Sequence, residues 1–292
     1  MDLKELFKGP EGLRAGWRFA AFVAIWYLLD YDLTPTLSRF YEFSPGFAPA
    51  DILVYELADA LVLLAISFAL VKLERHRLSW CGLTWEAAAP RQFGMGGLWG
   101  FGLVTLLFAA CWASGHASLA GLAEHGTAFW KYLALWLGGM LLVGVAEELL
   151  FRGYALASLV RGLGFWPAAL ITSLAFGGLH LQKPMETAAD ILNIVLLGLV
   201  MCYSVRRTGA LWFAIGFHAA FDFCALGFYG APNTGNDGVP LPHHLLDTRI
   251  EGPAWLTGGP QGLEASWLLP LLTAVMFLAL RRSYPSDRYP HD

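Results

Sequence analysis

Long apolar stretches alternate with short polar connections along the whole chain. The pattern predicts helical spans near 16–33, 51–73, 94–115, 128–152, 166–182, 186–205, 209–229 and 265–281. Most approach or exceed the roughly 20 apolar residues that cross a bilayer as a helix. The predicted fold is therefore an all-α, polytopic membrane bundle of about eight transmembrane helices.

These spans divide the chain into consecutive parts. The predicted parts are a cytoplasmic N-terminal segment 1–15, a region 16–125 with transmembrane helices 1–3, a core 126–229 with helices 4–7, a loop 230–264, and a last helix with its cytoplasmic tail, 265–292. The loop is the longest interruption and is rich in Gly, Pro and Asn. A loop of this length is either disordered or a lid over an opening.

Composition supports the membrane class. Hydrophobic residues make up 57% of the chain and charged residues 14%, whereas soluble domains carry about 25% charged residues. The net charge of −4 gives no sign of nucleic-acid binding. The four cysteines lack metal or redox spacing and are expected to be small buried side chains. They are Cys81, Cys111, Cys202 and Cys224. The first apolar run has no clear cleavage site, so it is interpreted as a retained span.

The distribution of basic residues predicts the orientation in the membrane. Eight spans place both termini on one side, and 15 of the 19 lysines and arginines fall on that side. The other four, expected on the opposite side, are Arg39, Lys131, Lys183 and Arg249. Because positive residues are enriched on the cytoplasmic side, both termini are predicted to be cytoplasmic, and the loop 230–264 extracytoplasmic.

The fourth span contains three charged residues. In the run from Gly139 to Arg152, two adjacent acids, Glu147 and Glu148, precede Arg152. Charge within a membrane segment is expensive and marks a functional site by default. Glu148 and Arg152 are four residues apart on one helix face, which predicts a structural ion pair. Glu147 lies about 100° round the helix and is predicted to be the free, reactive carboxylate.

The length of this fourth helix decides whether Glu147 meets the histidines. If the helix ended at Arg152, Glu147 would lie near the cytoplasmic surface, with His180 some 20 Å deeper at 1.5 Å per residue. The clearest turn signal, however, is Arg161–Gly164. We therefore expect the helix to continue towards Val160, tilted or kinked at Gly153, which lowers Glu147 into the membrane.

Two histidines lie within predicted spans. His180 ends the fifth span, and His218 shares a helix face with Asp222 in the seventh. A lone intramembrane histidine is often a packing hydrogen-bond donor, but an acid pair, two histidines and an aspartate on three helices favour a site. For the other polar residues in spans, helix-end or inter-helix hydrogen bonds are predicted. These residues are Glu56, Asp59, Asp190 and Asn193. The alternative for Glu56 and Asp59, which are three residues apart, is that they line a cavity.

The ordered motifs of these three helices resemble those of the CPBP family of intramembrane endopeptidases. The motifs are Glu147-Glu148-x-x-x-Arg152, Phe176-x-x-x-His180 and His218-x-x-x-Asp222. This family includes the type II CAAX prenyl endopeptidases and bacteriocin-immunity relatives. The resemblance covers roughly 130–225, and the stretch Arg207–Trp212 looks like the bacterial branch. Many members carry Asn where this chain has Asp222.

The resemblance implies an eight-helix protease of the inner (plasma) membrane, with a cavity that opens towards the cytosolic face. It also implies that Glu147 activates water and that His180, His218 and Asp222 line the same cavity. The expected partners are a membrane peptide or protein substrate and the lipid bilayer. The sequence specifies neither the substrate nor its prenylation.

The chemistry of the residues is compatible with that implication. A carboxylate in a low-dielectric setting becomes a stronger base, so Glu147 is suited to take a proton from the attacking water and return it to the leaving amine. His180 would position the water or assist proton transfer, and His218 would donate to the developing oxyanion. An ionised aspartate only accepts hydrogen bonds, so Asp222 is expected to orient His218.

Three alternatives stand beside the metal-free protease. Glu147, His180, His218 and Asp222 are a plausible zinc set, although the chain lacks His-Glu-x-x-His and the resemblance favours a mechanism without a cofactor. A non-catalytic protein of the same fold would act in bacteriocin immunity or as a scaffold. A proton-coupled transporter also uses buried acids and histidines, but it predicts inverted repeats or broken helix pairs, which the sequence does not show.

Overall fold

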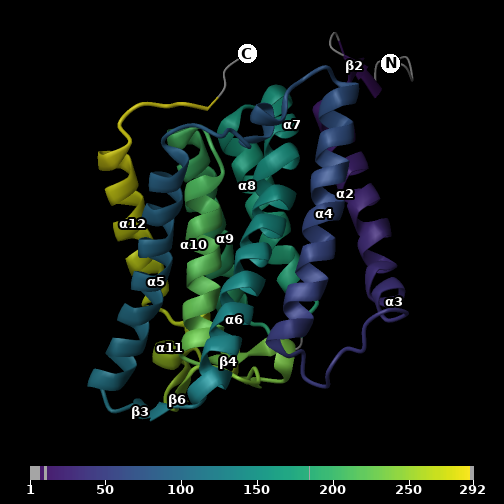
Figure 1. Ribbon diagram of the computed structural model, residues 1–292. Helices are drawn as coiled ribbons and strands as arrows, with labels where there is room; N and C mark the ends of the chain where they lie inside the picture. The colour runs from purple at the N-terminus through teal and green to yellow at the C-terminus, as the bar shows by residue number, and fades with distance from the viewer. Residues whose placement is uncertain (1–6, 10–11, 184, 290–292) are drawn as a thin grey trace.

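The computed structural model is a bundle of helices that run up and down along one common direction (Figure 1). It describes residues 7–9, 12–183 and 185–289. The principal helices are α2 (Ala15–Tyr31), α4 (Pro49–Leu73), α5 (Ala89–Ala113), α6 (Gly126–Glu148), α7 (Tyr154–Leu163), α8 (Phe165–His180), α9 (Ala188–Thr208), α10 (Trp212–Asp222) and α12 (Leu269–Ser283). Part of the predicted N-terminal segment 1–15 and of the tail lies outside the described residues.

The beginning of α2 and the end of α12 lie at the same end of the bundle, here called the terminal end (Figure 1). The other end, here called the loop end, carries the short elements α3 (Leu33–Leu37), β3 (Ala117–Leu122), β4 (Pro232–Asn233), β5 (Val239–Pro240), β6 (Leu246–Ile250) and α11 (Ala254–Thr257). The terminal end adds the short strands β1 (Lys8–Gly9) and β2 (Gly12–Leu13).

Four helices of the described chain are long and apolar enough to cross a membrane. They cover Pro49–Leu73, Ala89–Ala113, Gly126–Leu163 and Ala188–Thr208, and Trp212–Phe228 is a shorter apolar helix. Large apolar side chains such as Leu28, Leu98 and Leu271 are exposed on the outer surface, as a lipid environment requires. The predicted all-α membrane bundle is confirmed, and the count of eight crossings stays a prediction.

The fourth predicted span continues well past Arg152. After α6, residues Leu149–Gly153 form a π-helix, and α7 then continues the same helix to Leu163. This confirms the expected continuation beyond Arg152. A second π-helix, Phe223–Phe228, follows Asp222 at the end of α10. Such segments often mark functional sites, and both begin within two residues of a predicted site carboxylate.

The helix that carries His218 is held against α5 by glycines. A Cβ added at Gly96 would lie 2.0 Å from the carbonyl oxygen of Phe213, and one added at Gly100 would lie 2.2 Å from that of Phe217. On the facing helix, a Cβ at Gly216 would lie 2.2 Å from the carbonyl oxygen of Phe93. Small residues allow two membrane helices to approach this closely. These glycines therefore set the position of α10 and of its polar side chains.

Replacing Gly100 by Ala is expected to destabilise the protein, because the added methyl group meets backbone that cannot rotate away. Overpacking of this kind typically costs about 1–3 kcal/mol. Thermal unfolding in detergent measures the effect. Gly102→Ala on the same helix is the matched control, since no atom lies within 4 Å of its added Cβ. Equal melting temperatures for the two variants would contradict the close α5–α10 contact.

The predicted loop 230–264 is folded rather than disordered. Its strand β6 pairs antiparallel with β3, from the loop between α5 and α6, and β4 pairs with β5. Asn193 of α9 donates hydrogen bonds to the backbone carbonyls of Glu264 and Ser266, at 3.0 and 3.1 Å. These contacts attach the loop to the loop end of the bundle.

Candidate active site

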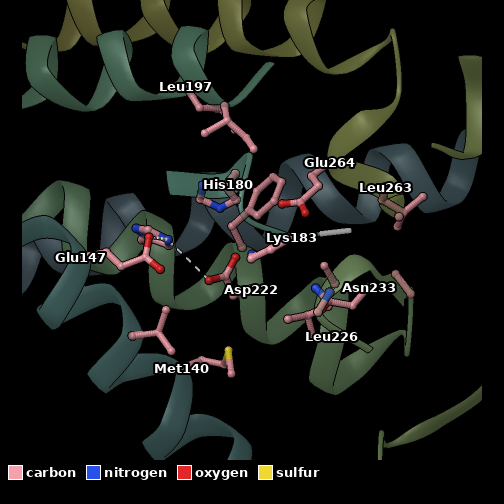
Figure 2. A pocket seen from close by; sticks show the side chains of 18 of the residues that line it. Met140, Glu147, His180, Lys183, Leu197, Asp222, Leu226, Asn233, Leu263 and Glu264 are labelled. Carbon is pink, nitrogen blue, oxygen red and sulfur yellow. Dashed lines mark hydrogen bonds and ion pairs between the residues drawn. The ribbon is translucent and has the colours of Figure 1, made fainter. Parts of the chain in front are cut away.

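A cavity of about 340 Å³ lies between α4, α6, α8, α9 and α10. Its lining includes all six polar residues that the sequence singles out: Glu147, Glu148, Arg152, His180, His218 and Asp222. Glu147, His180 and Asp222 point into the same space from three different helices (Figure 2). The structure therefore brings the predicted residues together in one place.

Arg152 and Glu148 line this cavity and are buried within the bundle. Arg152 Nη1 lies 3.1 Å from Glu148 Oε1, and both side chains have no exposed surface. The guanidinium stacks over the ring of Phe176 at 4.6 Å. Gly198 leaves room for it, because a Cβ there would lie 2.9 Å from Arg152 Nη2. The ion pair is thus enclosed by aromatic and backbone surfaces rather than by water.

His218 connects the three carboxylates. Its Nδ1 lies 2.9 Å from Glu148 Oε1, and its Nε2 lies 3.4 Å from Glu147 Oε2 and 3.5 Å from Asp222 Oδ2. Because an ionised carboxylate accepts, Nδ1–H donates to Glu148. The imidazole is then oriented with Nε2 towards the cavity acids Glu147 and Asp222.

The hydrogen bond between Glu148 and His218 is the main feature that the sequence reasoning missed. Glu148 was expected to form an ion pair with Arg152 alone, and Asp222 was expected to orient His218. In the structure, Glu148 Oε1 accepts from both Arg152 and His218. Asp222 instead lies near the other ring nitrogen, Nε2. Helical spacing shows which residues share a face, but it does not show which face of α6 meets α10.

Glu147 and Glu148 differ sharply in their surroundings. The side chain of Glu147 is 33% exposed, whereas that of Glu148 is fully buried. Glu147 Oε2 makes no hydrogen bond of good geometry, although His218 lies 3.4 Å away. Glu147 is therefore the accessible carboxylate of the pair, and Glu148 is held in place by Arg152 and His218.

His180 approaches the cavity from the end of α8. Its Nδ1 lies 3.0 Å from the carbonyl oxygen of Phe176. A carbonyl only accepts, so Nδ1 carries the proton, and in the neutral ring Nε2 is left as an acceptor. The Phe176 ring packs edge-on against His180 and His218, with centroids 5.1 and 5.9 Å away. Phe176 thereby separates the two imidazoles and fixes both.

Further polar residues line the cavity. Glu56 of α4 faces the cavity, together with Lys183, Asn233 and Glu264 near its outer part. Burial raises the pKa of Glu264 to about 7, so this carboxyl group is mostly neutral below that pH and charged above it. Of these four, the sequence indicated Glu56 as a residue that lines a cavity or, by preference, makes a helix-end or inter-helix hydrogen bond, and the structure places it in the cavity. The other three lie in connections whose folding no periodicity reveals.

The remaining polar residues in spans have structural roles. Trp26 Nε1 of α2 donates to Asp59 Oδ1 of α4 at 3.0 Å. Asp190 accepts from the backbone nitrogen of Thr187 at 2.7 Å, at the start of α9. With the contacts of Asn193 described above, the predicted helix-end and inter-helix hydrogen bonds are confirmed for these three residues.

The zinc alternative finds no ready ligand set in the described part of the chain. Within that part, no group of three or more His, Cys, Asp or Glu side chains is arranged to hold a metal ion. Nδ1 of His218 and Nδ1 of His180 both contact protein oxygens, which leaves Nε2 as the second nitrogen of each ring. Metal removal tests this alternative directly.

The comparison with known families agrees with the geometry of the cavity. The fold and the lining define a helical membrane protein with a carboxylate–imidazole site. Residues 127–224 match the family model described as Type II CAAX prenyl endopeptidase Rce1-like. This segment holds Glu147, His180, His218 and Asp222, and it is similar to that membrane protease family. No curated protein matched the chain.

Proposed function

We propose that this protein is an intramembrane endopeptidase in which Glu147 activates the water that hydrolyses a peptide bond. One observation carries the proposal: of the two adjacent acids, Glu147 reaches the cavity and Glu148 is enclosed by Arg152 and His218. A partly desolvated carboxylate beside a cavity is a suitable general base. The match of residues 127–224 to the model of a protease family supports the same reaction.

The proposed reaction begins with proton transfer from water to Glu147. The water oxygen attacks the carbonyl carbon of the substrate and forms a tetrahedral intermediate with a negatively charged oxygen. Glu147 then delivers the proton to the leaving nitrogen, and the carbon–nitrogen bond breaks. The products are a new carboxyl end and a new amine, so atoms and charges balance without a cofactor.

His218 and His180 are assigned different tasks in this reaction. His218 is oriented by Glu148 through Nδ1, so its Nε2 is placed to donate to the oxyanion when it carries a proton. The carboxylates of Glu147 and Asp222 lie 3.4 and 3.5 Å from Nε2, on the same side of the ring as the cavity. His180, with Nε2 free to accept, is placed to hold the attacking water.

Comparative proteomics of membranes tests the proposal. Cells that carry the wild-type protein are compared with cells that carry Glu147→Gln at equal abundance. The expected result is a membrane protein that is shortened only in the presence of the wild type, with a new terminus at one position. Identical membrane proteomes would favour the non-catalytic alternative, in which the fold serves immunity or scaffolding.

Metal removal separates the glutamate mechanism from the zinc alternative. Cleavage by the purified protein is expected to persist in the presence of a strong zinc chelator, because no step assigned above uses a metal ion. The rate is measured on the substrate found by proteomics, before and after chelation. Loss of activity that returns when zinc is added back would overturn the metal-free mechanism.

A further inference from the structure

The outer wall of the cavity is built at the loop end of the bundle. Lys183 follows the end of α8, Asn233 and Gly235 belong to the loop after α10, and Gln261 and Glu264 precede α12. Figure 1 places these connections together at the end away from the two chain ends. The loop 230–264 therefore forms part of the cavity wall.

The cavity reaches the surface at that same end. Two lining residues are exposed, Phe47 before α4 and Gly235 after β4. Both lie in loop-end connections. In contrast, the described connections at the terminal end, between α4 and α5, between α7 and α8, and between α9 and α10, contribute no residue to the lining. The way into the cavity thus lies at the loop end.

The two ends of the bundle also differ in charge. The terminal end carries most of the basic residues, including Arg75, Arg77, Arg161 and Arg206. Arg152, which the sequence count assigned to this side, is buried within the bundle. Without it, 14 basic residues are assigned to this side against four on the other. Among the residues that the structure describes, the loop end carries the four basic residues predicted there, including Lys131 and Lys183. Positive residues near the membrane favour the cytoplasmic side, so the terminal end is assigned to the cytoplasm.

We propose that the cavity opens on the extracytoplasmic side of the membrane and takes peptide segments of membrane-anchored proteins that emerge on that side. That these peptide segments are cleaved rests on the proposed function, whereas the side of the membrane on which the cavity opens does not. The proposal departs from the cytosolic opening that the family resemblance implies. It follows from combining the loop-end opening with the charge asymmetry.

The lining indicates which segments fit. Below the polar outer part, the walls are apolar and include Ile52, Met140, Leu197 and Leu226. The carboxylate and imidazole groups lie further inside. An extended segment with apolar side chains next to the scissile bond would bury those side chains here, while its polar flank stays near Lys183 and Glu264 at the outer part.

Cysteine labelling in oriented membrane vesicles tests the sidedness. The four native cysteines are buried, so the unmodified protein gives the background. Two variants report the two ends: Val239→Cys, at a position that is 52% exposed at the loop end, and Ser79→Cys, exposed at the terminal end. A third variant, Gln261→Cys, reports the cavity lining. The probe is a membrane-impermeant maleimide.

In right-side-out vesicles, Val239→Cys and Gln261→Cys are expected to react, and Ser79→Cys only after the vesicles are opened with detergent. Inverted vesicles should give the reverse pattern. Labelling of Ser79→Cys with protection of Val239→Cys in right-side-out vesicles would overturn the orientation. Protection of Gln261→Cys beside a reactive Val239→Cys would overturn the opening.

A second pair of cysteine variants repeats the test in case a variant of the first set does not fold. Leu119→Cys in β3, at a 49% exposed position, and Arg77→Cys before α5, also exposed, repeat the comparison at the two ends. Labelling requires no cleavage, so the same pattern is expected in a Glu147→Gln background. Failure of the labelling pattern therefore refutes the sidedness alone, and failure of the proteomic test refutes the protease alone.

Discussion

Glu147→Gln is expected to abolish cleavage while the folded yield stays at the wild-type level. Glutamine preserves the shape of the side chain and its contact with His218, but it cannot take a proton from water. General-base catalysis typically contributes a factor of about 10²–10⁴, so a loss of at least about 100-fold in kcat is expected. Cleavage of the substrate found by proteomics, normalised to the amount of folded protein in detergent, measures it.

Glu148→Gln is the matched control for this prediction, because it changes the adjacent acid in the same way. Glu148 is fully buried and accepts from both Arg152 and His218. Its neutralisation leaves the guanidinium of Arg152 without its counter-charge, so the main expected effect is reduced folded yield. An active Glu147→Gln together with a folded but inactive Glu148→Gln would show that the roles of the two acids are reversed.

Arg152→Ala is expected to lower the stability of the fold more than any other single change discussed here. It removes the partner of a carboxylate that has no exposed surface. Leaving a buried charge unpaired typically costs about 3–5 kcal/mol. The variant also loses the packing of the guanidinium over Phe176, at 4.6 Å. Folded yield after detergent extraction and the thermal unfolding midpoint measure the effect.

Two further variants define the cause of that loss. Arg282→Ala removes an exposed arginine in the last turn of α12 and should leave the unfolding midpoint close to that of the wild type. Arg152→Met combined with Glu148→Gln removes both charges and should recover part of the stability lost by Arg152→Ala, since no unpaired charge remains. A double variant as unstable as the sum of the single changes would contradict a charge-pair explanation.

The class of fold follows from the sequence because it depends on local properties of the chain. Apolar runs of membrane length must form helices, since a helix satisfies every backbone polar group within its own segment. The contact of Glu148 with Arg152 and the shared face of His218 and Asp222 depend only on helical periodicity, and the structure contains both. The continuation of the fourth helix to Leu163 was readable from the turn signal at Gly162 and Gly164.

Contacts between helices depend on packing, and the sequence pattern did not predict them. The spacing of Gly96 and Gly100 does not reveal that they meet the backbone of α10, yet that contact places His218. The hydrogen bond from His218 to Glu148, and the approach of Glu56 to the cavity, depend on how α4, α6 and α10 are turned towards one another.

The sequence alone thus determined which side chains carry charge into the membrane and which of them share a helix face. Only the tertiary structure decided that Glu147 faces the cavity, that Glu148 is enclosed, and that the opening lies at the loop end. The reason is that the rotation and depth of packed helices result from side-chain contacts between segments far apart in the chain.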